Sequence, residues 1–549
     1  MTINPLENPL YYLENFRQAL DWVARRYDDL LDEQERGFID DFIGLPLPAQ
    51  GLLVRMVMRK GTLFRASKLV YAELGDTALA AQPLLDNGWI DGQAAISLDE
   101  LFALLRKDEL SACFKVHGVR ASEKKAELLA RLQALYPVPL TMRQWYPAFD
   151  EPVFSLRVMA ICDRLRLLYF GNLYQEWSEF VLADLGVYRY EKVEFSADSR
   201  GINARGDIDV CLRLHACRQA LEEGVELRGL AGQAIAIESS NPWLQTRRAK
   251  LLFQLGQQAE RLKDWPLAMS LYAQCDYPGA RSRWIRVLEL NGDHAQTMAL
   301  LEQVRAEPRS DAELQHLARV LPRLQRALGL PVERRPAVRE VSRLDVNVVP
   351  HGDFSVEQLI QLHLHEDSAQ VHYVENALIN SLFGLLCWPA IFAPLPGAFF
   401  HPFHTGPSDL HSADFYRRRA ALFDECLAQL DSEAYKDTIR EYFQSKAGLQ
   451  SPFVYWGVIT SELLEQALHC LPAEHLRHWF RRLLLDIKAN RAGMPDLIQF
   501  FPEQRSYRMI EVKGPGDRLQ DNQLRWLDFC AEHGMPVLVC YVQWSPPEL

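Results

Sequence analysis

The stretch Gly493-Met494-Pro495-Asp496-Leu497-Ile498, followed shortly by Ile510-Glu511-Val512-Lys513-Gly514, sets the expected architecture of the C-terminal part of this chain. Two short apolar runs, separated by a polar turn, predict two adjacent β-strands. Because side chains alternate between the faces of a strand, Glu511 and Lys513 project to one side and Val512 to the other. Pairing of the strands brings Asp496 to that side as well. We therefore expect two carboxylates and an ammonium group to meet at one point.

These residue types suit metal-assisted phosphodiester hydrolysis. Hard divalent cations prefer oxygen ligands, and a bound ion generates hydroxide from water and stabilises the charge that develops on phosphate. The compact ammonium of Lys513 would orient the attacking water or offset charge in the transition state. The constellation resembles the PD-(D/E)xK nuclease core, whose letters are filled by Pro495, Asp496, Glu511 and Lys513. An acidic-x-Lys pattern at a strand end also occurs in surface salt bridges, and that alternative stays open at this point.

Size and composition describe an ordinary globular protein. Its 549 residues suggest about three or four domains. The net charge of −12 argues against a protein that is basic all over, but it leaves room for local basic surfaces. The ten cysteines form no CxxC pair, which favours a reducing compartment and gives no zinc-finger signal. No signal peptide opens the chain, and prolines break the apolar stretch 377–400. We expect a cytoplasmic location (nucleoid-associated if bacterial) and no membrane contact.

The N-terminal part, residues 1–92, is predicted to be a helical DNA-binding domain. Apolar residues recur there at helical spacing, as in Phe16, Leu20 and Val23. A cluster of cations interleaved with apolar residues follows, and it would place a basic edge on DNA phosphates: Arg55, Arg59, Lys60, Arg65 and Lys68. A solvated helix flank is the alternative explanation of this cluster.

Residues 93–140 resemble the SAP motif, a short helix-extended-helix unit that binds duplex DNA. Leu98, Leu101, Leu105 and Leu110 precede Phe114, and the run 122–129 opens a second helix. The expected phosphate contacts, which would position DNA without reading its sequence, are Lys115, Arg120, Lys124, Lys125 and Arg131. Lysines on the wet face of an amphipathic helix pair are the alternative.

Residues 141–330 are predicted to be helical. One expected helix covers 157–169 and another 177–186. From 249 to 301, two-helix units recur and resemble tetratricopeptide repeats, whose stacked pairs form a solenoid. Such repeats would dock a repair-protein partner or brace the last domain. The segment 331–351 is rich in Pro, Arg and Val without a helical period, and we interpret it as a linker.

The last domain, 352–549, contains the run Val374-Glu375-Asn376-Ala377-Leu378. Glu375 is expected to begin a long apolar helix that packs deep in the domain. A carboxylate there is costly unless it is paired or binds a cation. We therefore predict that Glu375 is a metal ligand, with an N-terminal cap at the helix dipole as the alternative.

The order of these parts resembles the Fanconi-associated nuclease family, most closely from 352 onward, where Glu375 is followed by the motifs of Asp496 and Glu511-Val512-Lys513. The resemblance implies a multidomain, mainly α protein with a C-terminal α/β nuclease domain of the PD-(D/E)xK (restriction-endonuclease-like), virus-type replication-repair class. It further implies a structure-specific nuclease that depends on Mg2+ or Mn2+ and cuts 5′-flap and related branched DNA in interstrand crosslink repair.

The same resemblance assigns roles to individual residues. Glu375, Asp496 and Glu511 become metal ligands together with the carbonyl of Val512, and Lys513 becomes the catalytic lysine. Gln523 and Trp526 match the glutamine and aromatic residue that follow the lysine. Asn522 stands where animal members carry a basic residue, so a basic pocket for a 5′ phosphate does not carry over.

Three arginines near these motifs are expected DNA clamps or surface salt-bridge partners: Arg491, Arg518 and Arg525. The scattered histidines match no compact zinc spacing, and no GxxxxGK[ST] motif occurs, so neither a zinc site nor a nucleotide cofactor is expected. Two other functions remain open from the sequence. One is a non-catalytic DNA-repair scaffold, and the other is a junction-resolving or restriction-type endonuclease.

Overall fold

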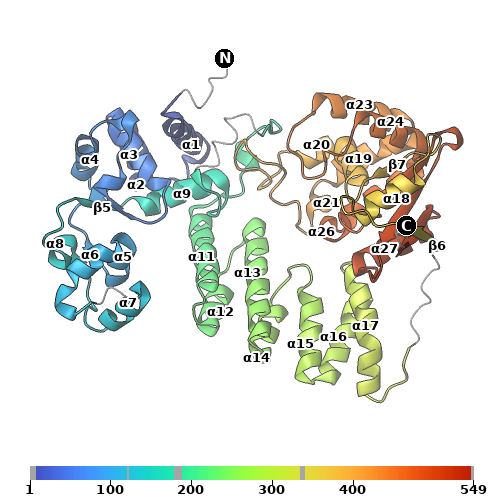
Figure 1. Cartoon of the computed structure of the whole chain (residues 1–549), viewed down its shortest axis with the longest axis horizontal. Helices are drawn as coiled ribbons and strands as arrows, with labels where there is room; N and C mark the ends of the chain where they lie inside the picture. Colours follow the sequence, from blue (N-terminus) through green and yellow to red (C-terminus); the bar gives the residue numbers. More distant parts are fainter. Residues whose placement is uncertain (1–7, 120–122, 178–187, 334–340, 546–549) are drawn as a thin grey trace. The chain divides into compact units, whose positions relative to one another are not determined.

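The computed structural model describes residues 8–119, 123–177, 188–333 and 341–545 (Figure 1). The chain divides into two compact units. Met1–Tyr188 with Ile202–Ile208 form the first, here called the N-terminal unit. Arg189–Gly201 with Asp209–Leu549 form the second, the C-terminal unit. The helix predicted over 177–186 falls almost entirely outside the described residues.

Helices dominate the first part of the N-terminal unit, as predicted: α1 (Tyr11–Tyr27), α2 (Glu33–Gly44), α3 (Leu47–Val57) and α4 (Thr77–Asp86). Asp32 caps α2 by accepting the backbone N–H of Glu35 at 2.8 Å. The sequence did not predict the antiparallel sheet β1–β5–β2, formed by Leu63–Arg65, Val153–Leu156 and Ile90–Asp91. These strands have two to four residues, too few to display an alternating pattern.

The SAP-like part has its own small core. It consists of α5 (Leu98–Leu104), α6 (Lys107–Cys113) and α7 (Lys125–Gln133), with β3 (Ala95–Ile96) paired to β4 (Leu140–Thr141) and α8 (Met142–Trp145) after it. The leucines before Phe114 lie on two short helices, because the extended backbone of Leu105 (ψ 147°) separates α5 from α6. Trp145 and Phe114 are buried against one another at 6.0 Å between ring centroids. Helix α9 (Met159–Phe170) confirms the helix predicted over 157–169.

Helices of the predicted repeat region follow one another as α11 (Arg205–Glu222), α12 (Leu227–Ile235), α13 (Pro242–Arg261), α14 (Trp265–Ala273), α15 (Ala280–Asn291), α16 (His294–Ala306) and α17 (Asp311–Ala327) (Figure 1). A Cβ atom on Gly256 would lie 2.6 Å from the ring of Tyr272, so a glycine is needed where α13 meets α14. The two-helix units predicted from residue 249 onward are confirmed.

A five-stranded sheet of order β6–β10–β9–β8–β7 organises the nuclease-like part. The strands are β6 (Ser342–Val348), β7 (Val371–Tyr373), β8 (Leu497–Phe501), β9 (Ser506–Lys513) and β10 (Val537–Trp544). β10 is parallel to β6 and to β9, whereas β8 is antiparallel to both of its neighbours. The linker predicted over 331–351 is therefore wrong for 342–348. Leu344, Val346 and Val348 alternate with polar residues, which is the period of a strand, and the interpretation as a linker overlooked it.

Helices cover both faces of this sheet. Ile360 of α18 (Val356–Leu364) packs on one face with Leu497, Ile510 and Val512. The other face meets a larger core that includes α19 (Leu378–Leu386), α25 (Ala473–Leu485) and α27 (Asp521–Glu532). The remaining helices are α20 (Trp388–Ile391), α21 (Phe415–Arg418), α22 (Ala420–Ala428), α23 (Ala434–Ser445), α24 (Ser461–Cys470) and α26 (Ile487–Asn490).

The apolar stretch 377–400 forms α19, α20 and buried loop, as predicted. Among the helices that the structure describes, none combines the length and the apolar character needed to cross a membrane.

Candidate active site

Asp496, Glu511 and Lys513 lie at one end of the central strands. Leu497 pairs with Ile510, so the next row of the antiparallel ladder places Asp496 opposite Glu511 with both side chains on one face. The Lys513 Nζ lies 2.6 Å from Glu511 Oε1, which confirms that these two side chains project to the same side. Asp496 Oδ2 accepts the backbone N–H of Val512 at 2.8 Å. The convergence expected from strand alternation is present.

Glu375 does not lie where the sequence predicted. Helix α19 begins only at Leu378, and Glu375 is exposed in the turn between β7 and that helix. Asn376 adopts a left-handed backbone (φ 52°), which stops the helix from extending back to Glu375. Glu375 therefore does not begin a buried helix, and the expectation that burial makes its charge costly is wrong. Glu375 nevertheless lies near Asp496, because the preceding residue, Val374, donates its N–H to the carbonyl oxygen of Asp496 at 2.9 Å.

Two hydrogen bonds hold the Glu375 carboxylate in this exposed turn. The Tyr373 hydroxyl donates to Oε2 at 2.6 Å, and the Asn376 side-chain amide donates to Oε1 at 3.1 Å. Burial and the hydrogen bond to Glu375 raise the pKa of the Tyr373 hydroxyl, which therefore remains a donor. Sequence reasoning missed Tyr373. Its position two residues before the acid is the signal that would have indicated it.

The electrostatics of the site favour a bound cation. Burial raises the pKa of Asp496 and, together with the charge of Asp496, that of Glu511. The negative charge of Glu375 also raises the pKa of both carboxyl groups. Glu511 is 0% exposed, and apart from the ion pair with Lys513 neither of its oxygens accepts a hydrogen bond from the described residues. The one positive charge of Lys513 thus faces the carboxyl groups of Asp496, Glu511 and Glu375, and a bound cation would offset the remaining negative charge.

This donor set fits a hard divalent cation. All of the candidate ligand atoms are oxygens, and Lys513 is the one donor near the buried Glu511 carboxylate among the described residues. No three His, Cys, Asp or Glu side chains in the described ranges are already arranged as a metal-binding group. Mg2+ often binds through one or two carboxylates and keeps several waters. The geometry therefore suits direct contacts from Asp496 and Glu511, with Glu375 reached directly or through water.

The loop before Asp496 is tied to helix α27. Gly493 has φ +89°, and a Cβ atom there would lie 2.6 Å from the side chain of Asn522. Trp526 donates its indole N–H to the carbonyl oxygen of Ala492 at 3.2 Å. Gln523 Oε1 accepts the backbone N–H of Gln520 at 2.9 Å, so its carbonyl oxygen caps its own helix. These contacts keep α27 at the edge of the site.

Several cations that the sequence suggested for DNA contact are engaged within the protein. Arg55 pairs with Glu73 at 2.6 Å and stacks 3.9 Å from the Tyr12 ring centroid, so its charge already has a partner within the protein. Four other cations donate a hydrogen bond to an oxygen of the protein. Lys125 donates to the carbonyl of Leu105, Arg491 to that of Pro452 and Arg59 to that of Lys68, and Arg525 donates to the side-chain oxygen of Gln315. Lys60, Lys115, Lys124 and Arg518 are exposed.

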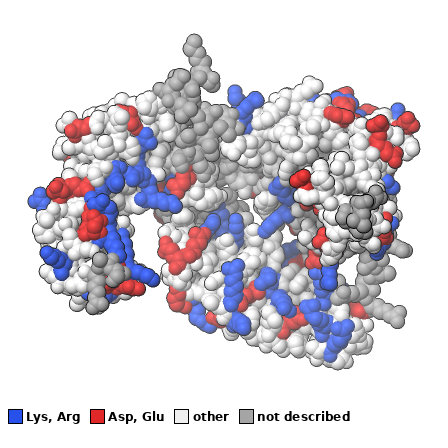
Figure 2. Space-filling view, in the orientation of Figure 1, with Lys and Arg blue, Asp and Glu red and all other residues white. Residues whose placement is uncertain are grey.

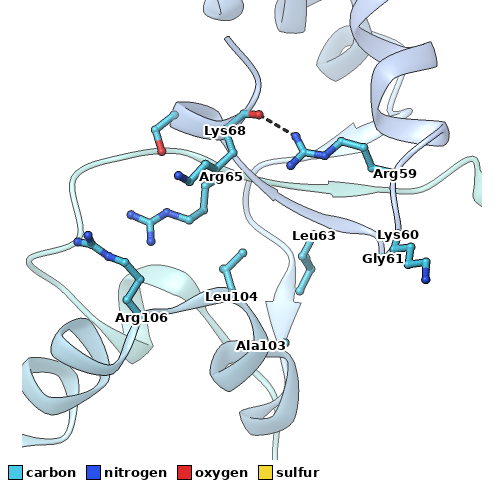
Figure 3. Close-up of a pocket in the computed structure, with 10 residues that line it drawn as sticks. Arg59, Lys60, Gly61, Leu63, Arg65, Lys68, Ala103, Leu104 and Arg106 are labelled. Atoms are coloured by element: carbon cyan, nitrogen blue, oxygen red, sulfur yellow. Dashed lines mark hydrogen bonds between the residues drawn. The ribbon is translucent and has the colours of Figure 1, made fainter. Parts of the chain in front are cut away.

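A basic cleft of about 470 Å3 lies in the N-terminal unit (Figure 3). Its cations come from three segments and are Arg59, Lys60, Arg65, Lys68 and Arg106. Arg65 is braced by carboxylates, with Glu109 at 2.8 Å and Glu151 close by. The ammonium groups of Lys60 and Lys68 have no carboxylate partner among the described residues. Figure 2 shows a band of Lys and Arg side chains on this unit. Sequence reasoning missed Arg106, which is distant from the other four in the chain.

Within the described ranges, the histidines form no cluster that could hold a metal ion. His401 and His404 are both buried, with ring centroids 4.1 Å apart, and burial lowers the pKa of both, that of His404 to about 4. His372 bonds to Gln466 at 2.8 Å. These rings therefore pack and bond as neutral groups in the interior.

Three family models match parts of the chain. "FAN1, HTH domain" matches residues 10–91, "Fanconi anemia-associated nuclease SAP domain" matches 95–145, and "VRR-NUC domain" matches 430–544. The first two cover the segments that line the basic cleft. The third contains Asp496, Glu511 and Lys513, whereas Glu375 precedes it.

Similar proteins match along nearly the whole chain. The "Fanconi-associated nuclease 1 homolog" of Pseudomonas aeruginosa is 59% identical over 540 residues, which cover 98% of this chain and 97% of that protein. Relatives from Oryza sativa and Homo sapiens are 24% and 25% identical over 97% of this chain, which spans 62% of each. A crystal structure of "paFAN1 bound to 2nt 5'flap DNA with gap" matches with a TM-score of 0.91 and 59% identity, over 98% of this chain and 99% of that one.

Proposed function

The chain belongs to the Fanconi-associated nuclease family, and we propose that it cleaves 5′-flap and related branched DNA in interstrand crosslink repair. It is a nuclease with a VRR-NUC domain. The observation that supports the catalytic site best is the pairing of Lys513 with buried Glu511, opposite Asp496. The flap substrate is supported by the solved relative, whose crystals contain 5′-flap DNA.

The residues of the site divide the work of phosphodiester hydrolysis. Asp496, Glu511 and Glu375 would hold a divalent cation, which we propose to be Mg2+ or Mn2+, with the carbonyl of Val512 as a further ligand. When bound, that cation supplies charge stabilisation at the phosphate and lowers the pKa of water. Lys513 donates from Nζ to the attacking water or to the phosphate oxygen that gains charge. We expect a 3′ hydroxyl and a 5′ phosphate as products.

The basic cleft is proposed to hold the backbone of a duplex arm. Lys60 and Lys68 offer ammonium groups that have no carboxylate partner in the described part of the chain. Arg65 is fixed by its two carboxylates, and Arg106 lines the same space. Lys115, Lys124 and Arg518 are exposed and are proposed as further phosphate contacts. Phosphate contacts position DNA without reading its sequence, as a structure-specific nuclease requires.

Loss of the cleft lysines should weaken DNA binding in a salt-dependent way. The double variant Lys60→Gln with Lys68→Gln is expected to reduce the slope of log K against log salt by about 1.8, since each phosphate contact contributes roughly 0.9. Fluorescence anisotropy of a labelled flap in Ca2+ at several salt concentrations measures this slope. Lys263→Gln, at an exposed turn between α13 and α14, is the control and should leave it unchanged. An unaltered slope in the double variant would remove the cleft from the DNA path.

Substrate choice distinguishes the proposed function from its alternatives. Labelled 5′-flap, 3′-flap and four-way substrates are incubated with the full chain in Mg2+, Mn2+ or EDTA. We expect cutting of the 5′ flap to exceed that of the 3′ flap by about tenfold or more, which is about 1.4 kcal/mol of discrimination, and to cease in EDTA. Preferred cutting of an intact four-way junction would favour a junction-resolving enzyme. DNA binding without cutting in either metal would favour a non-catalytic scaffold.

The helical repeats are proposed as the surface for a repair-protein partner, supported only by the general use of such solenoids for docking. A nuclease that acts on chromosomal DNA belongs with the nucleoid in the cytoplasm, and this location is likewise a proposal.

A further inference from the structure

Glu375 is the exposed member of the three acids, yet its backbone is firmly fixed. The turn is anchored to the segment that carries Asp496 by two hydrogen bonds. Val374 donates its N–H to Asp496 O at 2.9 Å, and Asn376 Oδ1 accepts the N–H of Met494 at 3.1 Å. Asn380 further bonds to the carbonyl oxygen of Asn376 at 2.6 Å. The position of the Glu375 Cα relative to Asp496 is thus set by hydrogen bonds that do not involve the Glu375 side chain.

The carboxylate of Glu375 needs a second restraint. An exposed glutamate samples several rotamers and loses that freedom when it binds a ligand. Here Tyr373 donates to one oxygen at 2.6 Å and Asn376 to the other at 3.1 Å. A carboxylate has about four acceptor positions, so both oxygens keep a lone pair for another contact. The two donors orient the group without using up its capacity to bind.

We propose that Tyr373 and Asn376 are positioning residues that hold the Glu375 carboxylate ready for the divalent cation of the nuclease site. The inference rests on the proposed role of Glu375 as a metal ligand. Partners that hydrogen-bond a ligating group typically change metal affinity or activity by about 10–100-fold when they are replaced. Tyr373 is the cleaner of the two, because Asn376 also shapes the turn, whereas the Tyr373 side chain is 43% exposed and its hydroxyl serves Glu375.

The test uses the full chain without DNA and measures Mn2+ binding by the electron paramagnetic resonance signal of the free ion. Tyr373→Phe is expected to weaken Mn2+ binding about tenfold. The Mn2+ concentration that gives half-maximal cleavage should rise by the same factor, and saturating Mn2+ should restore the rate. Tyr416→Phe is the matched control, since its hydroxyl donates to Asp424 at 2.9 Å in the same unit and it is 36% exposed. That variant should bind Mn2+ as the wild type does.

A double-mutant comparison shows whether Tyr373 acts through Glu375. In a Glu375→Gln background, Tyr373→Phe should cause no further loss of Mn2+ affinity. A full additional loss would overturn the proposal, and so would wild-type Mn2+ affinity in the single Tyr373→Phe variant. A different result tests the proposed role of Glu375 as a metal ligand. If Glu375→Gln itself binds Mn2+ and cleaves DNA as the wild type does, then Glu375 is not a ligand, and the proposed metal set fails with it.

Discussion

Asp496→Asn is expected to lower the rate of 5′-flap cleavage by about a thousandfold while the affinity for the same flap in Ca2+ stays within about threefold. The substitution keeps the shape of the side chain and an oxygen that can accept the Val512 N–H, but it removes one of the charges that hold the cation. Removal of a single preorganised electrostatic group in other enzymes costs about 10²–10³-fold. Single-turnover cleavage at saturating Mg2+ measures the loss, and anisotropy measures the affinity.

The matched control for this substitution is Asp345→Asn. Asp345 lies on strand β6 of the same sheet, is exposed, and pairs with Arg343 at 2.7 Å. The Asp345→Asn variant should cleave the flap at the wild-type rate. Thermal unfolding provides a readout independent of turnover, because a cation that binds only the native state raises the melting temperature. Mn2+ should raise the melting temperature of the wild type and of Asp345→Asn. It should raise the melting temperature of Asp496→Asn much less. Undiminished cleavage by Asp496→Asn would remove this residue from the mechanism.

Lys513→Met is expected to have the second large effect, a loss of about 10²–10³-fold in the cleavage rate at saturating metal. Its effect on metal binding should have the opposite sign to that of an acid. The Lys513 ammonium lies 2.6 Å from Glu511 Oε1 and competes with a bound cation for the same negative charge. Removing it leaves the acids without an internal counterion, so Mn2+ affinity should rise. Rate and affinity measured on one preparation therefore separate the role of Lys513 from those of the acids.

Lys513→Arg is a further comparison for the same position. Its guanidinium keeps the charge but is planar and larger, and it does not replace a compact ammonium in a buried site. We expect Lys513→Arg to remain at least about tenfold slower than the wild type. If Lys513→Met cleaves as fast as the wild type, or binds Mn2+ more weakly, the assignment of Lys513 as the catalytic lysine is wrong.

The part of the site that alternates along strands was predictable. The period of two along β9 was enough to place Glu511 and Lys513 together, and the antiparallel neighbour β8 delivered Asp496 to the same row. The position of Glu375 was not predictable in this way. Its turn depends on a left-handed Asn376 and on hydrogen bonds to a segment distant in the chain, which leave no periodic pattern. An apolar run after an acid predicted a helix start that the structure places three residues later.

Surface cations illustrate a second limit of sequence reasoning. The run from Arg55 to Lys68 indicated a basic edge, but partners elsewhere in the chain decide which charges are available. Arg55 pairs with Glu73 and stacks on Tyr12, whereas Arg106 lines the cleft from another segment and pairs there with Glu109 at 3.3 Å. Strand β6 is a different case, because Leu344, Val346 and Val348 show the period of two that predicts a strand. Long-range pairing determines which surface cations are available, and local patterns do not report it.

Anomalous diffraction from crystals of the full chain containing Mn2+ tests the metal site most directly. We predict an ion with at least one oxygen of Asp496 and one of Glu511 at the distances of a hard divalent cation, about 2.0–2.6 Å. Glu375 should be bound to the same ion directly or through one water. An ion located away from these acids, or a Glu375 carboxylate turned away beyond the reach of a bridging water, would contradict this prediction.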